Sequence, residues 1–295
     1  MIGHLKIKSP WKQLAVLLAV SVPLLVLVVL NGQSATPVDL SQPNLVQAMK
    51  WSQAVSSIAF FFFPAFLYAA FTFRGRQFYF LGLRKAEKTN MYVLAAFCIM
   101  LAFPFVFWLG QLNHALPLPE SLYNMEKQTG KQLEALLKVN TTGDLIINVI
   151  VIALLPAICE ELYFRGALQR VLIHLTKSPW AGILLTALVF STLHFQFLGF
   201  FPRMFLGVVL GALYWYSGSL WTSILAHFVN NAVQVIAVSV APRYISENPQ
   251  MPVLTAIISG VAVWAIVWYF HRQSTTSWSR VYGVNELNPT NQFIA

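Results

Sequence analysis

Charged residues are scarce in this chain. Asp, Glu, Lys and Arg together make up 10% of its 295 residues, whereas soluble domains carry about 25%. Hydrophobic residues account for 57%, and the mean hydropathy is +0.64. This composition excludes an ordinary soluble domain and predicts an integral membrane protein.

Cysteine is almost absent as well. Cys98 and Cys159 are the two in the sequence, which is too few for a disulfide framework. Each lies within an apolar run, so we interpret both as small packing residues.

Eight hydrophobic segments approach the length of about 20 residues that a membrane-spanning helix needs. We therefore expect an all-α, polytopic integral membrane bundle of about eight transmembrane helices. Ser178-Pro179 predicts a helix start, and Ser217-Gly218-Ser219 predicts a tight connection. The segments are residues 13–31, 52–73, 91–112, 145–164, 179–195, 203–217, 219–240 and 253–271.

Acidic residues are the rarer sign of charge, ten against 19 Lys and Arg. If both termini are cytoplasmic, 13 of the 19 basic residues, Arg165 included, fall on the cytoplasmic side. This satisfies the positive-inside rule, so we expect both termini in the cytoplasm. The bases are spread over short loops, and we expect no nucleic acid partner. External residues 119–138 have the pattern of an amphipathic helix at the membrane surface.

Two of the few acids nevertheless lie inside an apolar stretch, as the adjacent pair Glu160 and Glu161. An ionised side chain there costs about 2.5–3.5 kcal/mol on insertion scales, so a functional role is expected. Arg165 follows Glu161 by four residues, so the two share a helix face and can pair. Glu160 points about 100° away and is free to act as a base.

Two later segments also carry polar faces. Phe190 and His194 are one helical turn apart, as are His227 and Asn231. Each pair alone is explained by helix packing. Three polar faces on hydrophobic segments, however, need partners in the protein interior, and glutamate with histidine can activate water.

In this order, the three patterns resemble the signature motifs of the CPBP family, also called Abi or type II CAAX prenyl endopeptidase-like. The resemblance covers roughly residues 145–235. Family members include CAAX prenyl endopeptidases and bacterial proteins tied to bacteriocin processing or self-immunity. The motifs are Glu160-Glu161-x-x-x-Arg165, Phe190-x-x-x-His194 and His227-x-x-x-Asn231.

The resemblance implies roles for these residues. Glu160 and His194 would activate the hydrolytic water, while His227 and Asn231 would stabilise the oxyanion; Glu161 and Arg165 would support them. The family has also been called metalloprotease, and Glu160, His194 and His227 could bind Zn²⁺ with an open position for water. No H-E-x-x-H motif is present, so we favour chemistry without a metal and keep zinc as an alternative.

We therefore expect an intramembrane endopeptidase acting on a membrane-associated or lipidated peptide or protein at the bilayer. Residues 1–144 would form three transmembrane helices with a basic cytoplasmic loop and the external amphipathic segment. Residues 145–240 would form the CPBP-like catalytic core, and 241–295 the last helix and a cytoplasmic tail. The alternatives are a proton-coupled transporter, because such relays use intramembrane Glu and His, and a catalytically silent immunity or adaptor protein.

Overall fold

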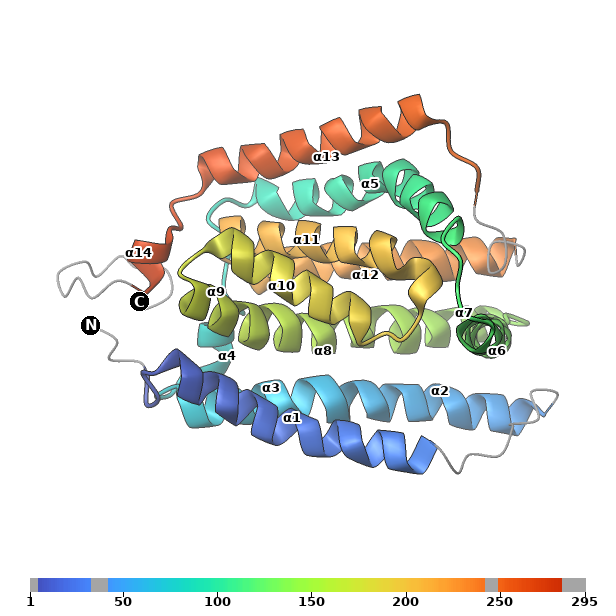
Figure 1. Ribbon diagram of the computed structural model, residues 1–295, viewed down its shortest axis with the longest axis horizontal. Coiled ribbons are helices and arrows are strands. Elements are labelled where there is room, and N and C mark those ends of the chain that lie inside the picture. Colours follow the sequence, from blue (N-terminus) through green and yellow to red (C-terminus); the bar gives the residue numbers. More distant parts are fainter. Residues whose placement is uncertain (1–4, 33–41, 242–248, 283–295) are drawn as a thin grey trace.

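The computed structural model describes residues 5–32, 42–241 and 249–282. Within these ranges the chain is helical, and the one β-type pairing is an isolated antiparallel bridge between Leu5 and Phe73. The expected all-α membrane bundle is confirmed (Figure 1).

The bundle is built from long helices, several of which contain π-helical turns. The N-terminal part holds α1 (Pro10–Gly32), α2 (Pro43–Ser57), the π-turn η1 (Ile58–Phe62), α3 (Phe63–Thr72), α4 (Gln77–Leu81), α5 (Asn90–His114) and α6 (Glu120–Leu137). The central part holds α7 (Thr142–Asn148), the π-turn η2 (Val149–Leu154), α8 (Leu155–Glu161), the π-turn η3 (Leu162–Gln169), α9 (Arg170–Thr176) and α10 (Pro179–Thr192). There follow the 3₁₀ turn η4 (Phe197–Gly199), α11 (Phe200–Ser217), α12 (Leu220–Val240), α13 (Val253–Gln273) and α14 (Trp278–Tyr282).

Seven helices in the described ranges are long and apolar enough to cross a membrane. The eighth expected span corresponds to α10, which has 14 residues. At 1.5 Å per residue it is about 21 Å long, less than the roughly 30 Å hydrocarbon core. The count of full-length spans is therefore seven, with α10 as a shorter helix beside α11.

The central helix is longer than expected. It runs without a break from Thr142 to Thr176, 35 residues, whereas the sequence predicted residues 145–164. Arg165 lies about two-thirds of the way along this helix and is fully buried. The side of the membrane to which it belongs stays a prediction. The turn η2 ends just before Pro156, whose missing N–H and bulky ring prevent a regular α-turn there.

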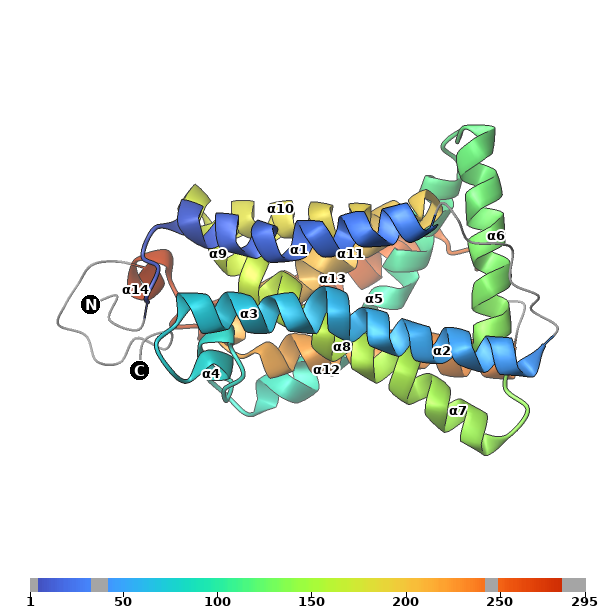
Figure 2. The ribbon, with the colours of Figure 1, turned by 90° about the horizontal axis from the view of Figure 1, so that it is seen from below.

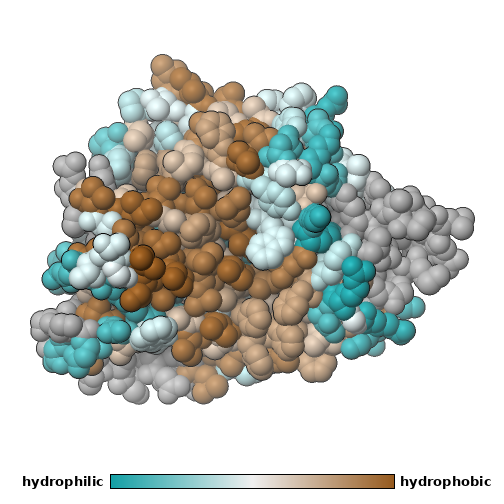
Figure 3. All heavy atoms as spheres, turned by 180° about the vertical axis from the view of Figure 1, so that it is seen from behind, coloured by the Kyte–Doolittle hydropathy of each residue, from teal (hydrophilic) through white to brown (hydrophobic). Residues whose placement is uncertain are grey.

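Apolar side chains form both the core and the outer surface. One buried hydrophobic cluster joins residues of all three expected stretches, from Leu5 through Phe164 to Val281. Outside, a broad hydrophobic band crosses the middle of the molecule between two hydrophilic ends (Figure 3). The band suits contact with lipid chains. The boundaries of the three expected stretches remain predictions.

The helix α6 stands apart from the bundle. It lies across one end of the molecule, roughly perpendicular to the long helices (Figure 2). It coincides with the amphipathic helix predicted over residues 119–138. Its position at a membrane surface remains a prediction.

Candidate active site

The central helix carries a buried ion pair. Arg165 Nη1 donates to Glu161 Oε1 at 2.7 Å, and both side chains are completely buried. The guanidinium also donates from Nη2 to the carbonyl of Gly207 on α11 at 3.2 Å and lies 4.8 Å from the centre of the Phe190 ring. The predicted pairing of Glu161 with Arg165 is thus present, and it joins the central helix to α11 and α10.

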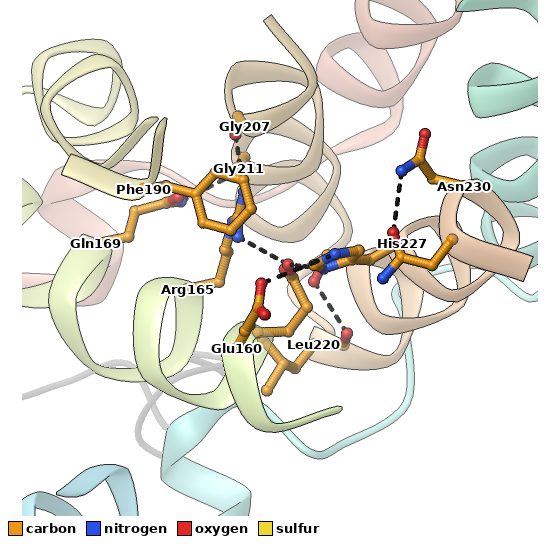
Figure 4. Close-up of polar contacts among 12 residues, drawn as sticks. Glu160, Arg165, Gln169, Phe190, Gly207, Gly211, Leu220, His227 and Asn230 are labelled. Atoms are coloured by element: carbon orange, nitrogen blue, oxygen red, sulfur yellow. Dashed lines mark hydrogen bonds and ion pairs between the residues drawn. The ribbon is translucent and has the colours of Figure 1, made fainter. Parts of the chain in front are cut away.

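His227 of α12 lies close to both glutamates, and Figure 4 shows it facing Glu160. Its Nδ1 is 2.9 Å from Glu161 Oε1, a hydrogen bond in which Nδ1–H donates to the carboxylate. Its Nε2 is 3.9 Å from Glu160 Oε2. That gap is too long for a direct hydrogen bond, and one water molecule can contact both groups across it.

The two glutamates differ in accessibility. The side chain of Glu161 has no exposed surface, whereas that of Glu160 is 12% exposed. Glu161 is occupied by Arg165 and His227, and Glu160 forms no hydrogen bond with a described residue. This is the division expected from the sequence, with one acid held and one available.

Phe190 separates the two histidines. Its ring centre is 4.7 Å from that of His194 and 6.1 Å from that of His227, with an edge-on arrangement in both cases. His194 lies just beyond the end of α10, and its Nδ1 is 2.7 Å from the carbonyl of Phe190. Since Nδ1–H must be the donor in that bond, the neutral ring presents Nε2 as an acceptor. No direct contact joins His194 to Glu160 among the described contacts.

Asn231 lies one turn beyond His227 on α12. Its Oδ1 accepts a hydrogen bond from Asn230 Nδ2 at 3.1 Å. This bond fixes the amide, and its NH₂ group has no partner among the described residues. Asn231 therefore retains a free donor beside His227.

The zinc alternative requires three ligands around one point. In the ranges that the structure describes, no three His, Cys, Asp or Glu side chains are placed to hold a metal ion. In both His227 and His194, Nδ1 is bound to an oxygen and Nε2 is left available, an arrangement that metal-binding histidines share. Whether zinc takes part in the reaction stays a prediction.

Comparison with known families gives a match in this part of the chain. Residues 142–233 match the family model described as type II CAAX prenyl endopeptidase Rce1-like. This segment resembles the Rce1-like family. It contains every candidate site residue, and the resemblance to CAAX-protease-like proteins is confirmed at the level of the family.

A second comparison gives a curated relative. The chain is 34% identical over 92 residues to the uncharacterized protein YpbD of Bacillus subtilis (strain 168), which is 30% of this chain and 44% of the relative. The chain thus spans less than half of that protein's length. No solved structure matches the chain. With seven helices of spanning length and an Rce1-like segment, the protein is an integral, multi-pass membrane protein.

The Rce1-like segment contains supporting contacts that the sequence reading missed. Gln169 Nε2 donates to the carbonyl of Gly211 at 3.0 Å, one turn beyond the bond from Arg165 to Gly207. Both glycines allow close approach, because a Cβ at Gly207 would lie 3.0 Å from that of Ala187, and one at Gly211 would lie 2.6 Å from Gln169 Oε1. The G-x-x-x-G spacing in a hydrophobic segment was an available signal.

Two further residues, outside the Rce1-like segment, hold the loop that follows His194. Asn113 of α5 donates from Nδ2 to the carbonyl of Phe197 at 2.8 Å and accepts from the N–H of Phe201 at 2.9 Å. Glu126 of α6 accepts from the N–H of Leu198 at 3.0 Å. Phe195, which directly follows His194 in this loop, has a left-handed backbone with φ +52°. No local pattern predicted these long-range contacts.

Proposed function

We propose that this protein is an intramembrane endopeptidase that hydrolyses a peptide bond in a membrane-associated or lipidated polypeptide. The observation that carries the proposal is the position of His227 close to both Glu160 and Glu161, inside the segment that matches the Rce1-like family. Carboxylates this deep in an apolar helix are retained for function.

Glu160 is the proposed general base, assisted by His194. Glu160 takes a proton from water, and the resulting hydroxide attacks the carbonyl carbon of the scissile bond. The bare Nε2 of His194 orients this water by accepting its second hydrogen. The C–N bond then breaks as Glu160 gives its proton to the leaving nitrogen. Glu160 is then a carboxylate again, and the hydroxide remains on the acyl product.

His227 and Asn231 are the proposed donors to the oxyanion. In this role His227 donates from Nδ1 to Glu161 and from Nε2 to the developing charge. The free NH₂ of Asn231 supplies a second donor. Glu161 and Arg165 act by holding His227 and the central helix in place.

The substrate must reach a site about halfway along the 35-residue helix. A polypeptide already in the membrane, with or without an attached lipid, meets that requirement. The proposed orientation has both termini in the cytoplasm. The termini themselves lie outside the described residues.

The test compares new N-termini of membrane proteins in cells producing either wild-type protein or the Glu160→Ala variant at matched levels. The proposal expects at least one fragment that depends on Glu160. Identical fragment profiles would contradict it, and they are the outcome expected of a transporter or of a catalytically silent adaptor.

A further inference from the structure

A cavity of about 250 Å³ lies away from the candidate active site, between α2, the end of α6 and the start of α7. Its lining includes Val46, Lys50, Trp51, Lys138, Asp144 and Ile147. These elements meet at the end of the bundle crossed by α6 (Figure 2). The lining residue Val151 precedes Glu160 by nine positions, about 13 Å along the helix, so this is a separate site.

The charge of the cavity is positive. Lys50 is 8% exposed and forms no ion pair within 4.0 Å with any residue in the described ranges. Lys138 is a second, more exposed lysine at the rim. A buried ammonium group requires a counter-charge or hydrogen-bond acceptors, so the cavity favours an anion.

The acid in the lining is already engaged. Asp144 Oδ2 accepts from the N–H groups of Asn140 at 3.0 Å and of Thr141 at 2.9 Å. Together with the Thr141 side chain it forms the capping box of α7, a stabilising role of its own. Asp144 therefore offsets only part of the positive charge of the two lysines.

The mouth of the cavity continues into an apolar surface. Trp51 and Val55, one turn apart on α2, are 57% and 64% exposed. On the neighbouring helix, Ile147 and Ile150 are likewise exposed. Large apolar side chains beside a basic cavity match a ligand with an anionic head and a hydrocarbon chain. An acidic soluble peptide would leave this apolar row uncovered.

We propose that the cavity binds an anionic membrane phospholipid. Its phosphate lies against Lys50 and Lys138, and an acyl chain follows Trp51, Val55 and Ile150. Trp51 is suited to the boundary between headgroups and chains. This site is independent of the proposed proteolysis.

The test is native mass spectrometry of the purified full chain, titrated with phosphatidylglycerol or with phosphatidylcholine of the same acyl chains. Wild-type protein should retain phosphatidylglycerol preferentially. Lys50→Gln and Lys138→Gln should each lower that retention about fivefold, the effect of one basic contact with an anionic headgroup. Lys131→Gln, the same charge change two turns earlier on α6, should not.

Three results would overturn the proposal. The first is equal retention of the two lipids, and the second is equal phosphatidylglycerol retention in all variants. Because Lys138 is exposed, its variant decides the matter even if Lys50→Gln does not fold. The third is displacement of the bound lipid by excess inorganic phosphate or by an acidic peptide, which would assign the site to those ligands instead.

Discussion

Glu160 and Glu161 are adjacent in sequence, yet their surroundings differ because neighbouring helical positions face different partners. Glu161 contacts Arg165 on its own helix and His227 on α12. The pairing with Arg165 could be predicted from the i,i+4 spacing. The bond to His227 could not, because it depends on how closely α12 approaches the central helix.

Arg165→Ala should destabilise the fold. It leaves the Glu161 carboxylate buried without its cation, and breaking one partner of a buried pair costs about 3–5 kcal/mol. Thermal unfolding in detergent would measure the loss, with Arg74→Ala, which removes an exposed arginine, as the control. Equal melting temperatures for the two variants would show that the pair contributes little.

Activity should survive removal of metal ions. Glu160 and the two histidines are not arranged as a zinc site among the described residues, and the proposed water activation requires only side chains. Exhaustive chelation of the purified protein should therefore leave cleavage unchanged. Stoichiometric zinc, with activity lost on chelation and restored on re-addition, would establish the alternative.

At the scale of elements, local sequence patterns predicted where helices begin and end better than they predicted whether a helix continues. Ser178 accepts from the N–H of Ala181 at the start of α10, and Gly218 has φ +68° in the connection before α12, as the local patterns indicated. The uninterrupted central helix was not foreseen. Proline usually limits a helix, but the π-turn η2 accommodates Pro156 and lets the helix continue.

The loop after His194 provides a test of positioning. Asn113→Ala removes both hydrogen bonds to this loop and leaves two backbone groups unsatisfied, at a cost of about 1–3 kcal/mol each. We expect lower stability together with a lower rate constant for cleavage.

Asn113→Asp keeps the acceptor for the Phe201 N–H but loses the donor to Phe197, so it should recover part of the rate. Asn90→Ala, which removes the exposed bond to the Tyr269 hydroxyl, is the matched control on the same helix. If the alanine variant at position 113 cleaves like wild type, the loop is not held by this contact.

At the scale of the whole molecule, hydropathy predicted the bundle because the bilayer restricts a spanning chain to helices or closed barrels. The first residue of α1 and the last residue of α13 lie at the same end of the molecule (Figure 1). At that end the carboxylate of Glu87, in the loop before α5, accepts from the N–H of Thr275 at 2.9 Å. These contacts place the basic loop and the segment after α13 on one side.

The predicted orientation assigns that side to the cytoplasm, following the distribution of basic residues. A reporter fused after the last residue should be active only as a cytoplasmic enzyme. The same reporter inserted in the 114–119 connection should report the opposite side. Activity on the external side from the C-terminal fusion would reverse the assignment.

The central claim is that Glu160 performs the chemistry. The most direct measurement is cleavage of a Glu160-dependent substrate by purified protein in proteoliposomes, comparing wild type with Glu160→Gln. We expect the variant to melt within a few degrees of wild type, because Glu160 forms no hydrogen bond with a described residue, and to show no cleavage. A folded Glu160→Gln protein that cleaves at the wild-type rate would contradict the account.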